Sequence, residues 1–148
     1  MAGFLTHKRI WGCTTFIDHV SSYVYVHLMR DFTLSETLLA KAAWEKVLAQ
    51  SDRTVKHYHA DNGRFADTGF VNDVNSKNQK ITFCGVGAHH QNGIAERKIK
   101  DVTLISRTIL LHAMRFWPEY ITIMLWPFAA KCAEDRMNTL HINLDYET

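Results

Sequence analysis

The sequence predicts a mixed α/β domain, and three observations carry this prediction. Segments rich in β-branched and aromatic residues alternate with segments of strong helix formers, in the order β-β-α-β-α-β-α-α. A length of 148 residues is typical of one domain, so residues 1–148 are expected to form a single one. The 47% hydrophobic and 22% charged residues are ordinary for a globular protein and exclude an intrinsically disordered one.

The chain is expected to begin with two antiparallel strands and a helix. Residues 13–18 and 23–29 have strand composition, and the short HVSS segment between them can turn the chain. Thr33 and Glu36 form a capping box for a helix of about four turns that ends near residue 50. The apolar residues expected on the buried face of this helix are Leu39, Ala42, Ala43 and Val47.

Two further strands flank a weak helix in the middle of the chain. Residues 54–60 alternate as in a strand and lead into the turn Asp61-Asn62-Gly63, so Asp61 is expected at a strand's carboxyl end. Residues 67–79 are weakly helical, and residues 80–86 form the next short strand.

Residues 94–116 carry the clearest helical pattern, because their apolar residues recur at intervals of three and four. Pro118 is expected in the first turn of a further helix, which Pro127 should kink or interrupt. Trp117 and Trp126 are expected to be core and helix-boundary residues.

The composition excludes several classes of protein. The cysteines Cys13, Cys84 and Cys132 form no C-x-x-C pair, so we expect buried thiols rather than disulfides or a zinc ribbon. No apolar run approaches the ~20 residues of a membrane helix, and the N-terminus lacks the apolar block of a signal peptide. An intracellular, soluble chain with no membrane partner is expected.

Two carboxylates are the candidates for chemistry. Asp61 ends a strand, and Glu96 lies in the first turn of the long helix, where the helix dipole favours the ionised form that a magnesium ligand needs. Converging carboxylates of this kind support two-metal phosphoryl transfer. Spacing alone favours the simpler alternative, in which Asp61 caps its turn and Glu96 is a solvated helix residue.

Basic residues follow Glu96 along the same helix, and they are Arg97, Lys98, Lys100 and Arg107. Helical periodicity places Glu96, Lys100 and Arg107 on one flank. Such a flank is either a solvated face or a track for the phosphates of a nucleic acid, and its position beside the carboxylate favours the second interpretation.

The histidines do not predict a zinc site. His57 and His59 differ by two positions, His89 and His90 are adjacent, and no third ligand has zinc-like spacing. His59, on the same strand face as Asp61, and His89 or His90 are expected to support the loop or to contact the substrate.

Two segments, HYHADNGRF (57–65) and FCGVGAHHQNGIAERKIKD (83–101), resemble the integrase catalytic core of copia-like LTR retrotransposons. The resemblance continues through residues 107–140 and covers FIDHVSSYVYVHL (16–28) upstream. The 35 positions between Asp61 and Glu96 fit the last two members of that family's Asp-Asp-Glu triad.

The resemblance implies an RNase H-like fold with a five-stranded mixed sheet flanked by helices. It implies a polynucleotidyl transferase that uses Mg²⁺ or Mn²⁺ to process 3′ ends of DNA and to transfer them into target DNA. Asp61 and Glu96 become catalytic metal ligands, and Asn92 and Lys100 become contacts to the element's DNA ends. The family also implies a homo-oligomer, no small-molecule substrate, and a path from a cytoplasmic particle to the nucleus.

The chain also departs from the family's pattern. The family's first triad aspartate lies on a strand upstream of residues 16–28, so the sequence is expected to be an N-terminally truncated core that is inactive or impaired on its own. Asp18 is a poor substitute, because only 43 positions separate it from Asp61 and it matches a common aspartate of the second strand. Ser22 replaces a usual arginine, and the sequence is expected to lack the family's zinc-binding module and DNA-binding tail.

Two alternatives to an integrase core remain open at the level of sequence. One is a non-catalytic remnant that binds nucleic acid or a partner through the basic helix. The other is an RNase H-type nuclease acting on an RNA–DNA hybrid, which the AHHQNGIAER segment (88–97) disfavours because it is integrase-like.

Overall fold

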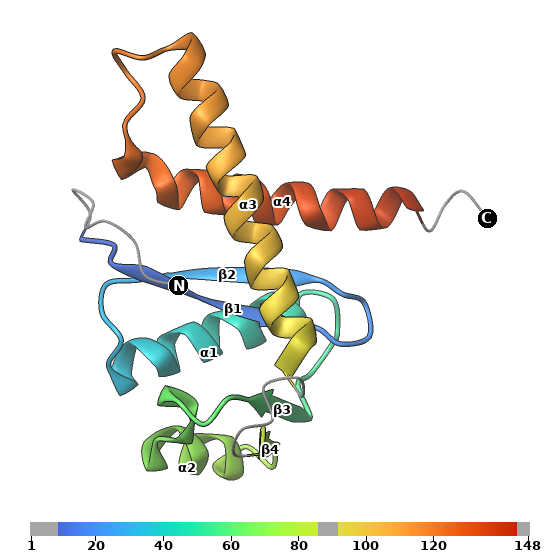
Figure 1. The fold of residues 1–148 in the computed structure, drawn as a ribbon. Helices are drawn as coiled ribbons and strands as arrows, with labels where there is room; N and C mark the ends of the chain where they lie inside the picture. The colour runs from blue at the N-terminus through green and yellow to red at the C-terminus, as the bar shows by residue number, and fades with distance from the viewer. Residues whose placement is uncertain (1–8, 86–91, 145–148) are drawn as a thin grey trace. The chain divides into compact units, whose positions relative to one another are not determined.

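The computed structural model describes the backbone of residues 9–85 and 92–144, with side chains up to residue 139. The order of strands and α-helices agrees with the sequence prediction of a mixed α/β fold (Figure 1). Two compact units are present: unit 1 comprises residues 1–30 and 95–148, and unit 2 comprises residues 31–94. Within the described ranges, the strands form two sheets of two strands each, so the expected five-stranded sheet is not observed.

Unit 1 contains an antiparallel strand pair, β1 (Gly12–Ile17) and β2 (Val24–Met29), as predicted. The turn between them is held by Asp18, whose carboxylate accepts hydrogen bonds from the N–H groups of Val20 and Ser21 and from the Ser21 hydroxyl. A side chain that binds the backbone two or three residues ahead stabilises a tight turn. Asp18 is therefore a turn-forming residue of unit 1.

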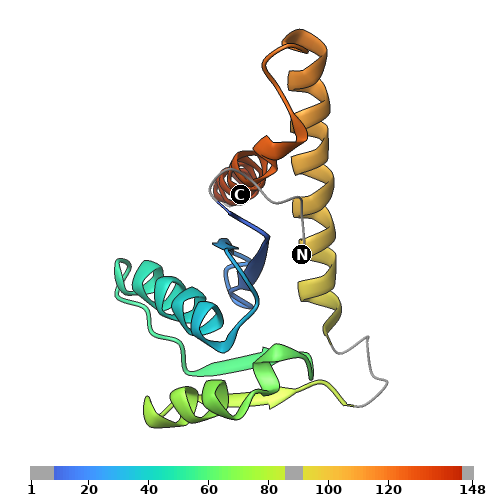
Figure 2. The ribbon, with the colours of Figure 1, turned by 90° about the vertical axis from the view of Figure 1, so that its left-hand side faces the viewer.

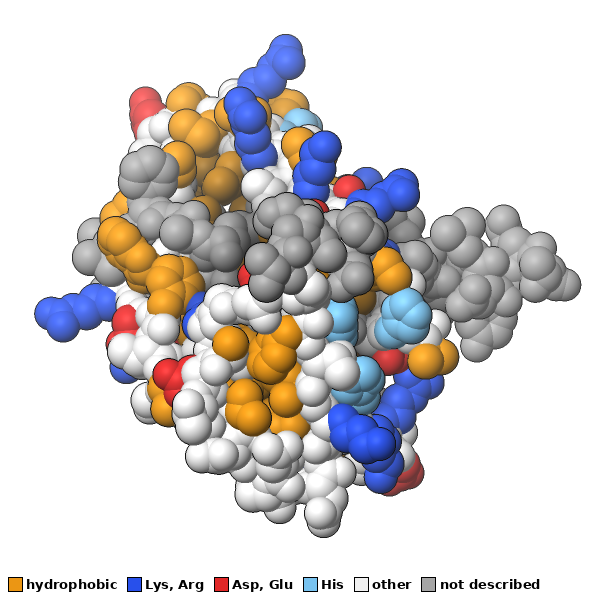
Figure 3. Space-filling model, turned by 60° about the horizontal axis from the view of Figure 1, so that its bottom comes forward, with side chains coloured by type: hydrophobic (Ala, Val, Ile, Leu, Met, Phe, Trp, Pro, Cys, Tyr) orange, Lys and Arg blue, Asp and Glu red, His pale blue; other side chains and the backbone are white. Residues whose placement is uncertain are grey.

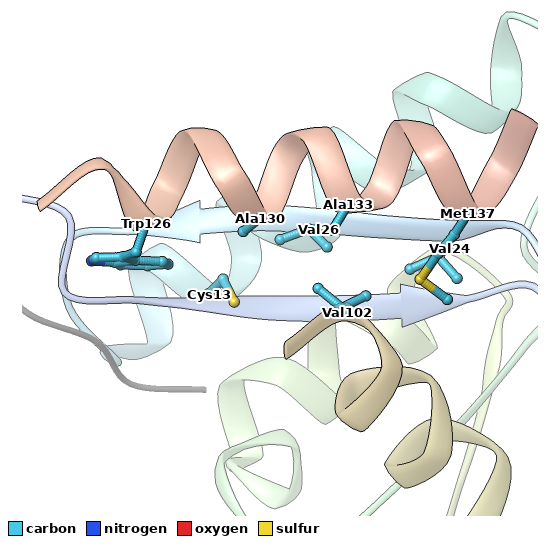
Figure 4. Packing of buried hydrophobic residues seen from close by; sticks show 8 residues of the cluster. All are labelled: Cys13, Val24, Val26, Val102, Trp126, Ala130, Ala133 and Met137. Carbon is cyan, nitrogen blue, oxygen red and sulfur yellow. The ribbon is translucent and has the colours of Figure 1, made fainter. Parts of the chain in front are cut away.

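Two helices complete unit 1: α3 (Gly93–Phe116) and α4 (Trp126–Leu144). The helix predicted for 94–116 is confirmed, although Val102 is its only fully buried side chain among the described residues. Figure 4 shows the core of this unit, in which strand and helix side chains meet; its members are Cys13, Val24, Val26, Val102, Trp126, Ala130, Ala133 and Met137. These buried apolar groups supply most of the unit's stabilisation.

Side chains of α4 close the outer edge of β2. The Asn138 amide accepts a hydrogen bond from the Val24 N–H at 2.9 Å and donates one to the Val24 carbonyl at 2.8 Å. Two residues further along β2, Lys131 donates a hydrogen bond to the Val26 carbonyl at 3.2 Å, and Glu134 accepts one from the Val26 N–H. Burial raises the pKa of Glu134 despite its ion pair with Lys131. The helix thus supplies the hydrogen bonds that a neighbouring strand would otherwise make.

The start of α4 corrects two sequence predictions. Pro118 does not begin a helix; residues 118–120 form a turn, a 3-10 turn follows at Ile123–Leu125, and α4 begins at Trp126. Pro127 does not interrupt a helix, because it occupies the first turn of α4, where a backbone N–H has no intrahelical partner. Trp126 is buried as expected, whereas Trp117 is 58% exposed and is not a core residue.

Unit 2 begins with α1 (Leu34–Ala49), whose N-cap Thr33 accepts a hydrogen bond from the Glu36 N–H, which is one half of the predicted capping box. The Thr33 N–H donates to the Asp31 carboxylate at 2.9 Å. The predicted buried face of this helix is wrong. The buried residues are instead Thr37, Ala40, Lys41 and Trp44, whereas Leu39 is 56% exposed. The apolar pattern assigns Lys41 to the solvent side of the helix. Lys41 is nevertheless buried, because its ammonium group forms ion pairs with Glu45 at 2.7 Å and with Asp73 at 2.8 Å.

The rest of unit 2 is a parallel strand pair with a helix against it. Strands β3 (His57–Ala60) and β4 (Lys80–Phe83) pair with His57 beside Lys80 and Ala60 beside Phe83. The helix α2 (Thr68–Ser76) lies along this pair and buries Phe70 and Val74 (Figure 2). Both strands are shorter than the sequence predicts.

Two predictions about the whole chain can be compared with the structure. Cys13 and Cys84 are buried thiols as expected, but Cys132, on α4, is exposed. Among the helices that the structure describes, none combines the length and apolar character needed to cross a membrane.

The β2 edge provides a first prediction. Asn138→Ala removes both hydrogen bonds to Val24 and leaves two part-buried backbone groups without partners, so the free energy of unfolding should fall by about 1–3 kcal/mol. Urea denaturation measures this loss. Arg136→Ala, at an exposed position on the same helix, is the control and should change stability by less than about 0.5 kcal/mol. Equal stabilities of the two variants would contradict the assigned role of Asn138.

A second prediction concerns acid stability. Burial opposes ionisation of Glu45, but hydrogen bonds from Lys41, Gln79, Tyr58 and Lys77 outweigh it and lower its pKa to about 2 from 4.5. Because the folded-state pKa is the lower one, ionised Glu45 stabilises the fold above pH 4.5, and this contribution disappears as the pH falls toward 2. Glu45→Gln should lower stability at neutral pH and flatten the acid limb of the urea midpoint plotted against pH. An acid limb as steep as that of the wild type would show that another group is responsible.

Candidate functional site

Asp61 directly follows β3 and is exposed, as the sequence predicts. Its Oδ1 accepts a hydrogen bond from the Gly63 N–H at 3.3 Å, so the carboxylate also caps its own turn. A Cβ at position 63 would lie 3.3 Å from the same oxygen, which explains why glycine suits this close approach. Within the part of the chain that the structure describes, Oδ2 has no hydrogen-bond partner, and this oxygen is available to a ligand.

The turn that carries Asp61 is attached to the neighbouring strand by Asn62. The Asn62 amide donates a hydrogen bond of 2.8 Å to the carbonyl of Cys84, one residue after β4. The Cys84 N–H in turn donates to the carbonyl of Ala60 at 3.0 Å. These two bonds hold the segment on either side of Asp61 against the end of β4, so the carboxylate is positioned by the sheet.

Glu96 lies in the first turn of α3 and is exposed, also as predicted. The helix dipole stabilises a negative charge at this position. Asn92, half-buried, immediately precedes the helix, so it lies one turn before Glu96 along the chain. The residues of the loop before it, 86–91, fall outside the described residues, and so do His89 and His90.

The basic residues of α3 are arranged along the helix much as the sequence predicts. Arg97, Lys100 and Arg107 are exposed, whereas Lys98 is half-buried and has an interaction within the protein. Thr103, between Lys100 and Arg107 on the same flank, is exposed as well. The flank is therefore accessible along at least three turns of the helix.

The two candidate carboxylates belong to different units, Asp61 to unit 2 and Glu96 to unit 1. Among residues 9–85 and 92–139, no group of three or more His, Cys, Asp or Glu side chains is arranged to hold a metal ion. Convergence of Asp61 and Glu96 therefore remains a prediction from the sequence.

A polar cluster on β3 and β4 was only partly foreseen. His57 Nε2 lies 2.8 Å and His59 Nδ1 lies 2.9 Å from the Thr82 hydroxyl oxygen, and His59 Nε2 lies 3.5 Å from Cys84 Sγ. The sequence indicated His59 as a residue near Asp61. Thr82 and Cys84 were missed, because only the pairing register of the two strands brings them beside the histidines.

No model of a known protein family matches this chain. No curated protein matches its sequence either.

Solved structures, by contrast, do match the fold. The magnesium-bound catalytic core domain of HTLV-2 integrase superimposes in its dimeric form with a TM-score of 0.61 at 20% identity, covering 82% of this chain and 70% of that one. Its trimeric form gives a TM-score of 0.60 at 20% identity, with 89% and 85% covered. A chain of the simian T-cell lymphotropic virus intasome, bound to PP2A regulatory subunit B56 gamma, gives 0.64 at 18% identity, covering 90% of this chain and 49% of that one.

These similarities define the class of fold. The mixed α/β fold of this chain resembles that of retroviral integrase catalytic cores. At 16–20% identity the likeness concerns the arrangement of the backbone. The expected mixed α/β fold with a likeness to integrase cores is thus confirmed, whereas the five-stranded RNase H-like sheet is not.

The anchoring of the Asp61 turn provides a third prediction. Asn62→Ala removes the hydrogen bond to the Cys84 carbonyl, so stability should fall by about 0.5–1.5 kcal/mol and the Gly63 amide should exchange faster with solvent. Urea denaturation and hydrogen exchange measure the two effects. Asn75→Ala, at an exposed position on α2, is the control and should leave Gly63 exchange unchanged. Unchanged exchange in Asn62→Ala would show that the turn is held by other contacts.

Proposed function

We propose that this chain is the catalytic core of a copia-like retrotransposon integrase, which joins DNA by metal-dependent polynucleotidyl transfer. Asp61 and Glu96 are the two carboxylates of the family's triad that the sequence identifies, and each acts as a metal ligand. With the third carboxylate unidentified, activity of the chain alone is expected to be weak.

The observation that carries this proposal is the position of Asp61 on a fold of the integrase-core type. Its carboxylate follows a strand whose end is fixed to the neighbouring strand, and its Oδ2 has no partner among the described residues. Glu96 is exposed in a helical first turn, 35 positions further along the chain. Glu96 lies on a helix, and Asp61 directly follows a strand whose end is anchored, so regular structure positions both carboxylates.

The donor set fits a hard divalent cation, because both groups are carboxylates and magnesium or manganese prefers oxygen ligands. When bound, such an ion neutralises the charge that develops on a reacting phosphodiester. The chain's own contribution is to present the Asp61 and Glu96 carboxylates to the cation and to bind the DNA backbone. Asn92, Arg97, Lys98, Lys100 and Arg107 are proposed for that second task, since cations and amides commonly contact phosphates.

The proposed reaction exchanges one bond to phosphorus for another and needs no oxidant, reductant or further cofactor. An attacking water or DNA 3′-hydroxyl forms a bond to phosphorus while the bond to the leaving 3′ oxygen breaks. The nucleophile's proton is released to solvent, and the leaving oxygen takes one up. The substrates are the element's DNA ends and target DNA, and the chain is proposed to work in the nucleus as a homo-oligomer.

A nicking and joining assay tests the proposal. Purified protein with Mn²⁺ and a labelled DNA duplex should produce nicked or joined strands, and Glu96→Gln or Asp61→Asn should lower the rate by about 100-fold or more. Glu119→Gln removes an exposed carboxylate outside the proposed site and should retain the wild-type rate. Circular dichroism of each variant verifies that the fold is intact.

The two alternatives predict different results when DNA binding is measured beside nicking and joining. Salt-sensitive DNA binding without turnover at any metal concentration would favour a non-catalytic remnant. Preferential cleavage of the RNA strand of an RNA–DNA hybrid would favour an RNase H-type nuclease. Either result contradicts the integrase proposal.

A further inference from the structure

One face of the β3–β4 pair carries polar side chains that the proposed metal site does not use. In the parallel register His57 lies beside Lys80 and His59 beside Thr82. Neighbouring residues in paired strands share a face, and successive residues alternate between faces. All four side chains therefore lie on one face, and all four residues are exposed, whereas Tyr58 on the opposite face is buried. We call these four residues the His–Lys face; Figure 3 shows histidine side chains gathered beside lysine or arginine side chains on the surface.

A chain of hydrogen-bonding groups orders the two imidazoles. It runs from Cys84 Sγ to His59 Nε2 at 3.5 Å, from His59 Nδ1 to the Thr82 oxygen at 2.9 Å, and from that oxygen to His57 Nε2 at 2.8 Å. Three of the four imidazole nitrogens are engaged. No hydrogen bond to the fourth, His57 Nδ1, is found within the described part of the chain.

The direction in which these hydrogen bonds are donated determines whether His57 Nδ1 is a donor or an acceptor. The Thr82 hydroxyl has one proton, so with neutral rings it donates to one imidazole and accepts from the other. If Cys84 S–H donates to His59, His59 donates to Thr82, and Thr82 donates to His57 Nε2, the remaining proton of His57 lies on Nδ1. In the reverse direction Nδ1 is an acceptor. An anion at His57 therefore selects the first direction, and a cation or donor selects the second.

Lys80 makes an anion the better partner. It lies next to His57 in the register, it is exposed, and its ammonium group has no ion pair among the residues that the structure describes. An N–H donor beside an unpaired ammonium group is suited to an oxyanion such as a phosphate. The strand that carries His57 and His59 leads directly to Asp61, so a backbone with repeated phosphates could lie along this face and reach the carboxylate.

We propose that the His–Lys face binds a phosphodiester of the nucleic-acid strand, next to the phosphodiester that reacts at Asp61. Lys80 supplies the charge, His57 supplies an N–H donor from Nδ1, and Thr82 with His59 holds the His57 ring in the donor form. This inference rests on the proposed function and adds substrate contacts in unit 2 to those proposed on α3.

Binding in EDTA tests the proposal separately from chemistry. A fluorescent single-stranded oligonucleotide is titrated into the full chain, and anisotropy gives Kd over a range of salt concentrations. Lys80→Ala is expected to weaken binding about tenfold and to lower the slope of log Kd against log salt by about 0.7, the value for one phosphate contact on a single strand. Lys46→Ala, an exposed lysine on α1, is the matched control and should change Kd by less than about twofold.

The hydroxyl relay is tested by a pair of substitutions at position 82. Thr82→Val keeps the shape but removes the hydroxyl, so it should weaken binding, whereas Thr82→Ser should restore it. Nitrogen NMR of the histidine rings should show the proton of His57 on Nδ1 once the oligonucleotide is bound. An oligonucleotide with neutral methylphosphonate linkages should bind wild type and Lys80→Ala equally.

Each outcome identifies which proposal fails. Wild-type affinity in both Lys80→Ala and Thr82→Val overturns the His–Lys face as a phosphate site, even if nicking at Asp61 and Glu96 is observed. Binding that depends on Lys80 and Thr82, in a protein that never nicks or joins DNA, supports this face and overturns only the catalytic proposal. Absence of any binding at low salt overturns both.

Discussion

Unit 2 depends on one carboxylate, that of Glu45. It accepts hydrogen bonds from Lys41 and from three groups outside its own helix: the Tyr58 hydroxyl at 2.9 Å, the Gln79 amide at 2.7 Å and the Lys77 ammonium at 3.1 Å. These donors come from β3, from the segment before β4 and from the end of α2. The buried Lys41 ammonium group also pairs with Asp73, so two carboxylates balance its charge. The positions of β3 and β4, and hence of Asp61, follow from this network.

The Glu45 network and the His–Lys face lie on opposite sides of the same short sheet. Tyr58 faces the buried side and contacts Glu45, whereas His57 and His59 face outward. The buried side fixes the strands, so the exposed side can carry polar groups that contribute little to stability. This division explains why a pair of four-residue strands can present ordered histidines: their order derives from Thr82 and from the register rather than from burial.

The sequence predicts the succession of helices and strands because β-branched runs, the Thr33 cap and the period of residues 94–116 are local signals. It also predicts where Asp61 and Glu96 lie on their elements. Burial is less predictable, because Lys41 enters the core only through acids that are remote in sequence. The role of Pro127 depends on where α4 starts, which the apolar pattern does not specify. The Thr82 relay requires the strand register, which no single segment encodes.

The side chains of Asn138, Lys131 and Glu134 along β2 have a consequence for behaviour at high concentration. An open strand edge is a template on which another molecule can add a strand, and this is a common route to aggregation. At Val24 and Val26 the outward N–H and C=O groups are already bonded to α4. Intermolecular β-pairing on that side would first have to displace the helix. The side chains of α4 therefore protect the chain from polymerising through β2.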